Sequence, residues 1–352
     1  ATAGATGAPP SASIAPFAGN KVNAGEPARI KGTVASVADA STLKMSWSAT
    51  RAQIDPAGAD QAVDLTAAGF TSSVSLATEN LVLSPDVLTS GYRYKFRLDV
   101  EDGNGVAAAF IELEENTPPS DGTVGSVPLS GTALDTVFTM SASAWVDDEE
   151  PLAYRFMARV KGATRWTQLK DFSPVPEFVG TLPGGDADGK VEVAVEVKDS
   201  LGAVSAAKVI EVTSTWPVLA DETALNAALS GGVNAAEDAI KNGDPEGALN
   251  SVAAASKLFD NFKESQRRRR LLGSNGCVGG GGVNATGNAK DRAAQRETML
   301  NLTSSAGDAV PASSTFYATL AGTASAVLGD PCEATAAARS SGVNLVAGLI
   351  DA

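Results

Sequence analysis

Alternating apolar and charged positions mark a regular element of the chain, a strand expected over residues 92–100. Its apolar positions are Tyr92, Tyr94, Phe96, Leu98 and Val100, and its charged positions are Arg93, Lys95, Arg97 and Asp99. A period of two with one charged face is typical of a strand that is buried on one side only. The turn sequence DGNG at residues 102–105 follows, and it predicts a hairpin whose second strand covers residues 106–114.

The same pattern returns 97 residues further along the chain. At this offset Val100 falls on Val197, Asp102 on Asp199 and Gly105 on Gly202. A repeat of about a hundred residues that keeps strand, turn and returning strand in register is typical of tandem immunoglobulin-like or fibronectin-III-like sandwiches. Further strands are expected over residues 28–34, 43–49, 74–76, 191–197 and 206–213.

After residue 216 the chain becomes rich in alanine, and its apolar residues recur at helical spacing. The sequence Asp244-Pro245-Glu246 places a capping acid before a proline and a second acid, which is a strong helix-start signal. Helices are expected from Asp221 to Ile240, from Asp244 past Phe262, over residues 291–305 and 315–328, and from Asp330 to Ile350. Together they predict a helical bundle.

These patterns divide the chain into three expected domains, and the expected fold class is mainly β plus α. Residues 1–115 form an immunoglobulin-like or fibronectin-III-like sandwich, residues 116–216 a second sandwich, and residues 217–352 an α-helical domain. Within the helical part, residues 271–288 are rich in glycine and are expected to form a mobile loop.

Composition narrows the classes of function. The net charge of −14 argues against nucleic acid as a partner, because phosphate binding needs a basic face. The chain has no histidine, so it lacks the commonest general base and the commonest metal ligand. We therefore expect a protein that is not an enzyme and holds no cofactor and no metal. Hydrolysis by two facing carboxylates is the enzymatic alternative that these residues leave open.

Two acidic segments are candidates for calcium binding, which needs several carboxylate oxygens around one ion. One is the run Asp147-Asp148-Glu149-Glu150, and the other is the pair Asp186 and Asp188 in a glycine-rich stretch. The acidic run lacks the alternating spacing of a calcium loop, and the pair follows Pro183-Gly184-Gly185. Both segments are therefore expected to be solvated loops.

The cysteines and the glycosylation sequons indicate in which cellular compartment the protein is found. The two cysteines, Cys277 and Cys332, can form a disulfide worth about 4 kcal/mol, or they can be two free thiols. Asn284 and Asn301 each begin an Asn-x-Thr sequon. These features favour an extracellular, disulfide-bonded glycoprotein. The sequence has no apolar run long enough to span a bilayer and no signal pattern, so we expect that a signal was removed or that a longer protein contains this chain.

Four consecutive arginines, Arg267, Arg268, Arg269 and Arg270, have three interpretations. They match the R-x-K/R-R pattern of furin-like processing sites in secreted proteins. They could instead bind a sulfated glycan or an acidic partner. The third interpretation is a solvated helix end, where cations interact favourably with the helix dipole.

The segment from Asn116 to Phe156 carries a resemblance to a known family. Its characteristic positions are Asn116, Pro118, Pro119, Gly122, Pro128, Gly131, Thr136, Trp145, Asp147, Pro151, Leu152 and Tyr154. This pattern resembles the REJ (receptor for egg jelly) region of polycystin-1-like membrane proteins. Family members often carry a cysteine pair where this chain has Val124 and Ala142, and both are absent together, as expected if they pair with each other. We expect Trp145 to lie in the core of the second sandwich.

The resemblance implies a non-catalytic extracellular segment of a polycystin-1/REJ-like protein, acting in adhesion or scaffolding at the plasma or ciliary membrane, with a green-algal source as a side expectation. The implied partners are a polycystin-2-like cation channel, reached through membrane parts absent from this chain, and other extracellular glycoproteins. The family's self-cleavage tripeptide contains histidine, so cleavage there is not expected in this chain. The alternative is a structural matrix or cell-wall glycoprotein without any channel association.

Overall fold

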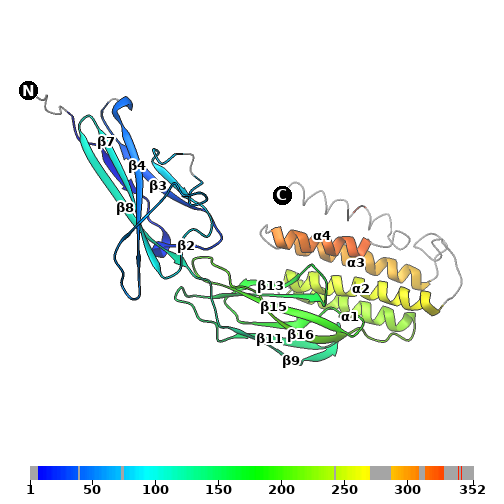
Figure 1. The fold of residues 1–352 in the computed structure, drawn as a ribbon. Coiled ribbons are helices and arrows are strands. Elements are labelled where there is room, and N and C mark those ends of the chain that lie inside the picture. The colour runs from blue at the N-terminus through cyan, green and yellow to red at the C-terminus, as the bar shows by residue number, and fades with distance from the viewer. Residues whose placement is uncertain are drawn as a thin grey trace, which may run out of the picture. The chain divides into compact units, whose positions relative to one another are not determined.

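Contacts divide the protein into two compact units, each described by itself below (Figure 1). The computed structural model describes residues 7–38, 40–72, 75–241, 243–269, 287–308 and 314–328, with residues 340 and 342. The first unit holds residues 1–120 together with two short segments, Val146–Leu152 and Lys198–Ser205. The second unit holds the rest of the chain.

The first sandwich packs a three-stranded sheet, in the order β1-β3-β6, against a five-stranded sheet, in the order β2-β8-β7-β4-β5. Its strands are β1 (Ser11–Ile14), β2 (Lys21–Asn23), β3 (Ala28–Ala35), β4 (Lys44–Gln53), β5 (Gln61–Val63), β6 (Asn80–Leu83), β7 (Tyr92–Asp102) and β8 (Gly105–Asn116). The neighbouring strands pair antiparallel except for β2, which runs parallel to β8.

The second sandwich repeats this arrangement strand for strand. Its strands are β9 (Thr123–Val127), β10 (Ser130–Thr132), β11 (Val137–Ser143), β12 (Ala153–Val160), β13 (Thr167–Ser173), β14 (Glu177–Thr181), β15 (Lys190–Lys198) and β16 (Lys208–Thr215). The sheets are ordered β14-β11-β9 and β10-β16-β15-β12-β13, and β10 runs parallel to β16 as β2 does to β8. The internal repeat expected from the sequence is thus confirmed as two sandwiches of one topology.

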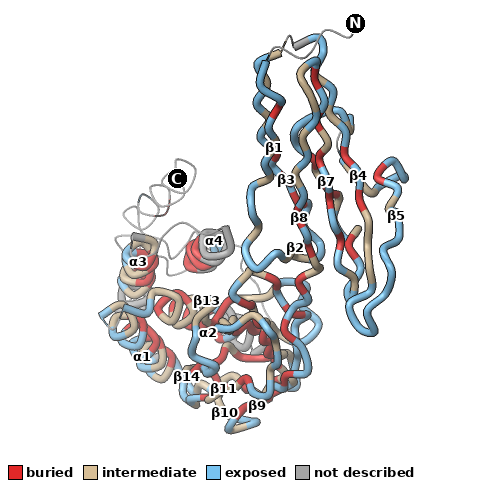
Figure 2. Tube along the Cα trace, turned by 90° about the vertical axis from the view of Figure 1, so that its left-hand side faces the viewer, coloured by how far each residue is buried: buried red, intermediate tan, exposed pale blue. Residues whose placement is uncertain are grey.

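The alternating pattern of residues 92–100 forms the inner and outer faces of β7. Tyr94, Phe96, Leu98 and Val100 are buried in the core of the first sandwich. Tyr92, by contrast, is half-buried, and the Arg51 guanidinium lies 4.9 Å from its ring centroid. Figure 2 shows buried positions along the strands of both sandwiches.

The strand expected over residues 74–76 is wrong, and Val74 lies outside the described residues. Leu76 lies in a bend, and the strand that follows is β6, which begins at Asn80 and pairs with β3 on the side opposite β1. Hydroxyl groups hold this bend: the Ala77 N–H donates to Ser75 Oγ at 3.0 Å, and Thr78 Oγ1 donates to the Ser75 carbonyl at 3.3 Å. Such local side-chain bonds compete with strand pairing, which explains why the apolar residue did not extend a strand.

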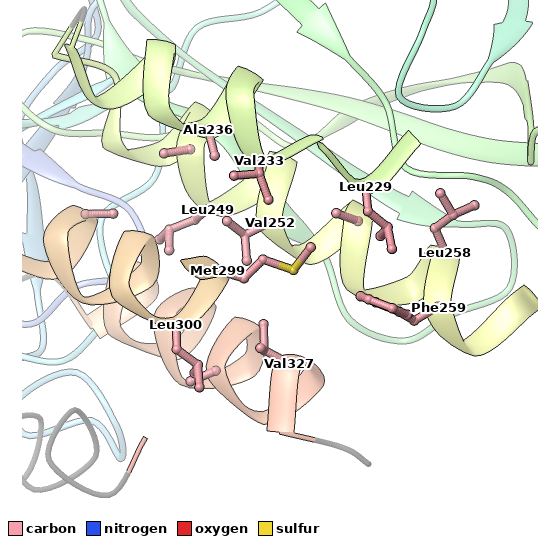
Figure 3. Packing of buried hydrophobic residues seen from close by; sticks show 14 of the residues in the cluster. Leu229, Val233, Ala236, Leu249, Val252, Leu258, Phe259, Met299, Leu300 and Val327 are labelled. Carbon is pink, nitrogen blue, oxygen red and sulfur yellow. The ribbon is translucent and has the colours of Figure 1, made fainter. Parts of the chain in front are cut away.

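The helices are α1 (Glu222–Lys241), α2 (Pro245–Arg269), α3 (Gly287–Asp308) and α4 (Ser314–Leu328). Both expected capping acids act at the helix starts: Asp221 Oδ1 accepts the Ala224 N–H at 2.9 Å, and Asp244 Oδ1 accepts the Gly247 N–H at 2.8 Å. The helices share a core that includes Leu229, Leu249, Phe259 and Met299 (Figure 3). The helix expected from Asp330 lies largely outside the described residues, as does most of the glycine-rich stretch 271–288.

None of the described helices is apolar enough over a sufficient length to cross a membrane.

Glu246, in the first turn of α2, ties the helices to the edge strand β13 of the second sandwich. Its carboxylate accepts hydrogen bonds from Gln168 Nε2 and from the Asp171 N–H, the latter at 2.8 Å. Burial raises the pKa of the Glu246 carboxyl, and Asp171 and Asp244 raise it further through their charge, against the lowering effect of the two hydrogen bonds. Helices α2 and α4 both contact β13.

The raised pKa of Glu246 predicts how stability depends on pH. Above the ordinary pKa of 4.5, the folded protein keeps this proton longer than the unfolded chain does, so the free energy of unfolding should fall as the pH rises through that window. Urea unfolding curves recorded at pH values from 4.5 to 7 measure this slope in the unfolding transition of the second unit. Glu246→Gln should flatten the slope, whereas the control Glu177→Gln on β14 should keep it. An unchanged slope in Glu246→Gln would contradict the assignment.

Candidate functional site

A buried polar network surrounds Asp199, in the turn between β15 and β16. Asp199 Oδ1 accepts three backbone N–H groups, from Leu201 at 2.8 Å, Gly202 at 2.6 Å and Ala203 at 2.9 Å. Gly202 has a φ of 99°, which glycine adopts without steric strain. The side chain of Asp199 is therefore an internal cap that fixes the turn.

Asn116, the first residue of the family motif, supplies the donor for the other oxygen of this carboxylate. Asn116 is fully buried at the end of β8, and its Nδ2 donates to Asp199 Oδ2 at 2.7 Å and to Asn23 Oδ1 at 2.9 Å. Asn23, on β2, in turn donates from Nδ2 to the Leu201 carbonyl at 3.1 Å. All of these residues belong to the first unit, so the network fixes the segment that leads from β8 to β9.

The acidic loop 147–150 lies beside the same network. Lys21 Nζ forms an ion pair with Glu149 Oε1 at 2.5 Å, and the Glu149 carbonyl accepts the Ser200 N–H at 3.0 Å. Burial raises the pKa of the Asp147 carboxyl, and the charges of Asp199 and Glu149 act in the same direction. Asp148 and Glu150 are exposed, as expected of a solvated loop, whereas Asp147 and Glu149 are half-buried, the latter held by its ion pair with Lys21.

The same construction closes the equivalent turn of the first sandwich. Asp102 Oδ1 accepts the N–H groups of Asn104 at 2.7 Å and Gly105 at 3.1 Å. Its Oδ2 accepts the Ser36 hydroxyl at 2.5 Å, and this bond lowers the pKa of the Asp102 carboxyl. In the first sandwich the second oxygen is therefore satisfied from within, by a serine.

Several other motif residues are contact partners of one another. A Cβ on Gly122 would lie 2.0 Å from the Trp145 ring, so that ring rests directly on the glycine backbone. A Cβ on Gly131 would likewise lie 2.4 Å from the Thr136 side chain, whose Oγ1 accepts the Thr132 N–H at 2.8 Å. The motif therefore describes pairs of residues that meet within the fold.

The expectation that Trp145 lies in the core is wrong. Trp145 is half-buried and follows the end of β11 at Ser143, because Ala144 adopts a φ of 58° and turns the chain out of the strand. Its ring packs on the backbone of Gly122, and its Nε1 is buried there. The core of this sandwich is formed by other residues, among them Phe138, Met140 and Phe156.

The calcium candidates do not assemble a cation site. Asp186 Oδ1 accepts the N–H groups of Asp188 at 3.0 Å and Lys190 at 2.8 Å, so it stabilises a tight turn. Within the residues that the structure describes, no cluster of three or more acidic or cysteine side chains is arranged to hold a metal ion.

The remaining candidate residues stay predictions. Asn301 is exposed on α3, while Thr303 of the same sequon is buried and donates to the Met299 carbonyl at 2.7 Å. Arg267–Arg269 end α2, and their side chains lie outside the described residues, as do Arg270, Asn284 and both cysteines.

Sequence reasoning named Asn116 and Asp199 but did not bring them together. The available signal was the Asp-x-x-Gly turn in both repeats, because a buried capping acid needs further donors. Asn23 and Lys21 carried no such signal, since the short strand β2 has no alternating pattern.

Substitution of Asn116 tests the network. Asn116→Ala should lower the free energy of unfolding by about 1–3 kcal/mol, because it removes the donor of buried acceptors on Asp199 and Asn23. Asn116→Asp should cost more at pH 7, since it sets two carboxylates against each other, and acid should relieve that cost. Urea unfolding measures both, with Asn80→Ala at the exposed first residue of β6 as the control. If Asn116→Ala lowers the free energy of unfolding no more than the control does, the role of the Asn116 amide is refuted.

The register of β9 and β11 predicts a disulfide between engineered cysteines at positions 124 and 142. Val124 and Ala142 are direct cross-strand partners, which explains why a family cysteine pair would occupy these two positions. Partners of this kind have Cβ atoms about 4.5–5.5 Å apart, so a small shift of the strands brings V124C/A142C to the about 3.5–4.5 Å of a disulfide. The bond should stabilise the fold by about 3 kcal/mol. Non-reducing peptide mapping detects the bond. The control V124C/S141C places its second thiol on the opposite sheet face and should stay reduced.

Several solved structures are similar to part of the chain at low sequence identity. A segment of titin has 14% identity and a TM-score of 0.34, covering 60% of this chain and 67% of its own. Fibronectin(III)-like modules of Clostridium thermocellum CbhA have 13% identity and a TM-score of 0.29, covering 58% of this chain and 94% of their own. Bovine butyrophilin has 13% identity and a TM-score of 0.26, covering 60% of this chain and 100% of its own. No curated protein sequence matches the chain.

The family match covers both sandwiches, the first helix and the beginning of α2. The model of the REJ domain matches residues 5–254, which include the motif that begins at Asn116 and the turn at Asp199. Because this match spans well over half of the 352 residues, the chain belongs to the REJ domain family.

Proposed function

We propose that the chain is a non-catalytic extracellular segment of a polycystin-1/REJ-like protein, acting in adhesion or scaffolding at a ciliary or cell surface. Membership of the REJ family supports the polycystin-like assignment and its extracellular side. REJ and immunoglobulin-like or fibronectin-III-like folds are typically non-catalytic. The segment would work in complex with a polycystin-2-like cation channel and with extracellular glycoproteins.

The observation that carries this proposal is how the motif residues are used. Asn116, Gly122 and Gly131 make internal contacts, with Asp199, Trp145 and Thr136 respectively. A motif built of internal contacts specifies a shape, and scaffolds depend on shape. Chemistry on a substrate would instead require reactive groups that converge on an open position.

Isolation of the native complex tests the proposal. The protein would be captured from detergent-solubilised membranes through a tag, and mass spectrometry would identify its co-purifying chains. Recovery of a polycystin-2-like channel and of membrane-spanning peptides of the same gene product supports the proposal. Recovery from the matrix or cell wall alone, with no channel, would establish the alternative of a structural glycoprotein. The same spectra report whether the chain is cut after Arg270 and whether Asn284 and Asn301 carry glycans.

A further inference from the structure

The outer face of the sheet β14-β11-β9 carries a row of exposed valines. Val127, Thr139 and Val179 are cross-strand partners in one register row, and Val137 lies two residues from Thr139 on the same face. The exposed fractions are 74% for Val127, 55% for Val137 and 62% for Val179. Leu129 and Val175, 63% and 51% exposed, follow β9 and precede β14. We call Val127, Val137, Thr139 and Val179 the valine face.

The inner positions of the same strands show that the valine face is not a second core. Phe138 and Met140 alternate with Val137 and Thr139 along β11, and both are fully buried. The sandwich therefore already buries one side of this sheet, and the valines remain on the other. Exposed apolar surface that is contiguous, and not scattered singly, marks interaction sites on many proteins.

The valine face is also nearly free of charge. Glu177 is the one charged residue in the three strands, and it lies on this face in the neighbouring row with Ser141. In the first sandwich the corresponding middle strand, β3, instead presents exposed Arg29 and Lys31. Because the two sandwiches share one topology, this difference belongs to the sequence of the second sandwich and is not required by the fold.

We propose that the valine face binds the same face of a second copy of this chain, related by a two-fold axis. The net charge of −14 makes two copies repel each other over much of their surface, and the repulsion is weakest where charges are lacking. A basic partner would be drawn to the acidic surface instead of to this uncharged face. Two-fold association requires a self-complementary patch, and the row Val127–Thr139–Val179 is one, because a two-fold axis through Thr139 sets Val127 of one copy against Val179 of the other. This inference does not depend on the proposed function.

Sedimentation equilibrium of the chain tests the proposal. The wild-type protein should form a dimer of twice 35.5 kDa with a dissociation constant below about 100 µM. Raising the salt concentration should preserve or strengthen the dimer, because salt screens the repulsion between the two acidic copies. V127S/V179S should raise the dissociation constant about ten-fold or more, because each substitution occurs twice in the interface. Thr139→Arg, which introduces the kind of residue that β3 has at Arg29, should abolish the dimer while keeping the fold.

A matched control replaces two exposed valines elsewhere, V37S/V106S in the first unit, where the exposed fractions are 73% and 74%. This variant should dimerise like the wild type, and circular dichroism should show all variants folded. A wild-type chain that stays monomeric would overturn the proposal. So would a dimer that Thr139→Arg leaves intact, or a monomer that binds neutral phosphatidylcholine vesicles through the valine face.

Discussion

The Asp199 carboxylate is nearly inaccessible to water, and a buried acceptor that lacks hydrogen-bond donors costs about 1–3 kcal/mol. Its two oxygens therefore constrain two separate parts of the chain. Oδ1 requires the turn between β15 and β16 to present three N–H groups, and Oδ2 requires the Asn116 amide at the end of β8. The position of one carboxylate thus sets both the turn and the path of the chain as it leaves the first sandwich.

In each repeat a turn aspartate has a second carboxylate oxygen that needs a hydrogen-bond donor, and the two repeats supply different donors. Asp102 receives the Ser36 hydroxyl from its own sandwich, whereas Asp199 receives an amide from the strand that precedes the second sandwich. Replacement of a local donor by a remote one makes the second repeat dependent on the first. This dependence gives a physical reason for a family motif that begins on the last residue of β8 and continues through β9.

The strands with period two and the helices with capping acids could be predicted from the sequence, because burial and capping leave local patterns. The network around Asn116 could not, since Asn23 lies 93 positions before Asn116 and Asp199 lies 83 positions after it, and no local pattern records which strands bring them together. Trp145 was misplaced for a related reason: an apolar ring predicts burial but does not specify the partner, and here the partner is the Gly122 backbone. The valine face was missed because valine favours strands whether its side chain lies inside or outside.

Strand β13 ends its sheet, and α2 and α4 contact it along this edge. An uncovered edge offers free backbone groups to any other strand, so the helices also protect the second sandwich from edge-to-edge aggregation. The family match stops at residue 254, inside α2, which runs to Arg269. A protein shortened to the matched residues would keep both sandwiches but lose α3, α4 and more than half of α2. The boundary of sequence similarity is therefore a poor guide to where a stable fragment of this family ends.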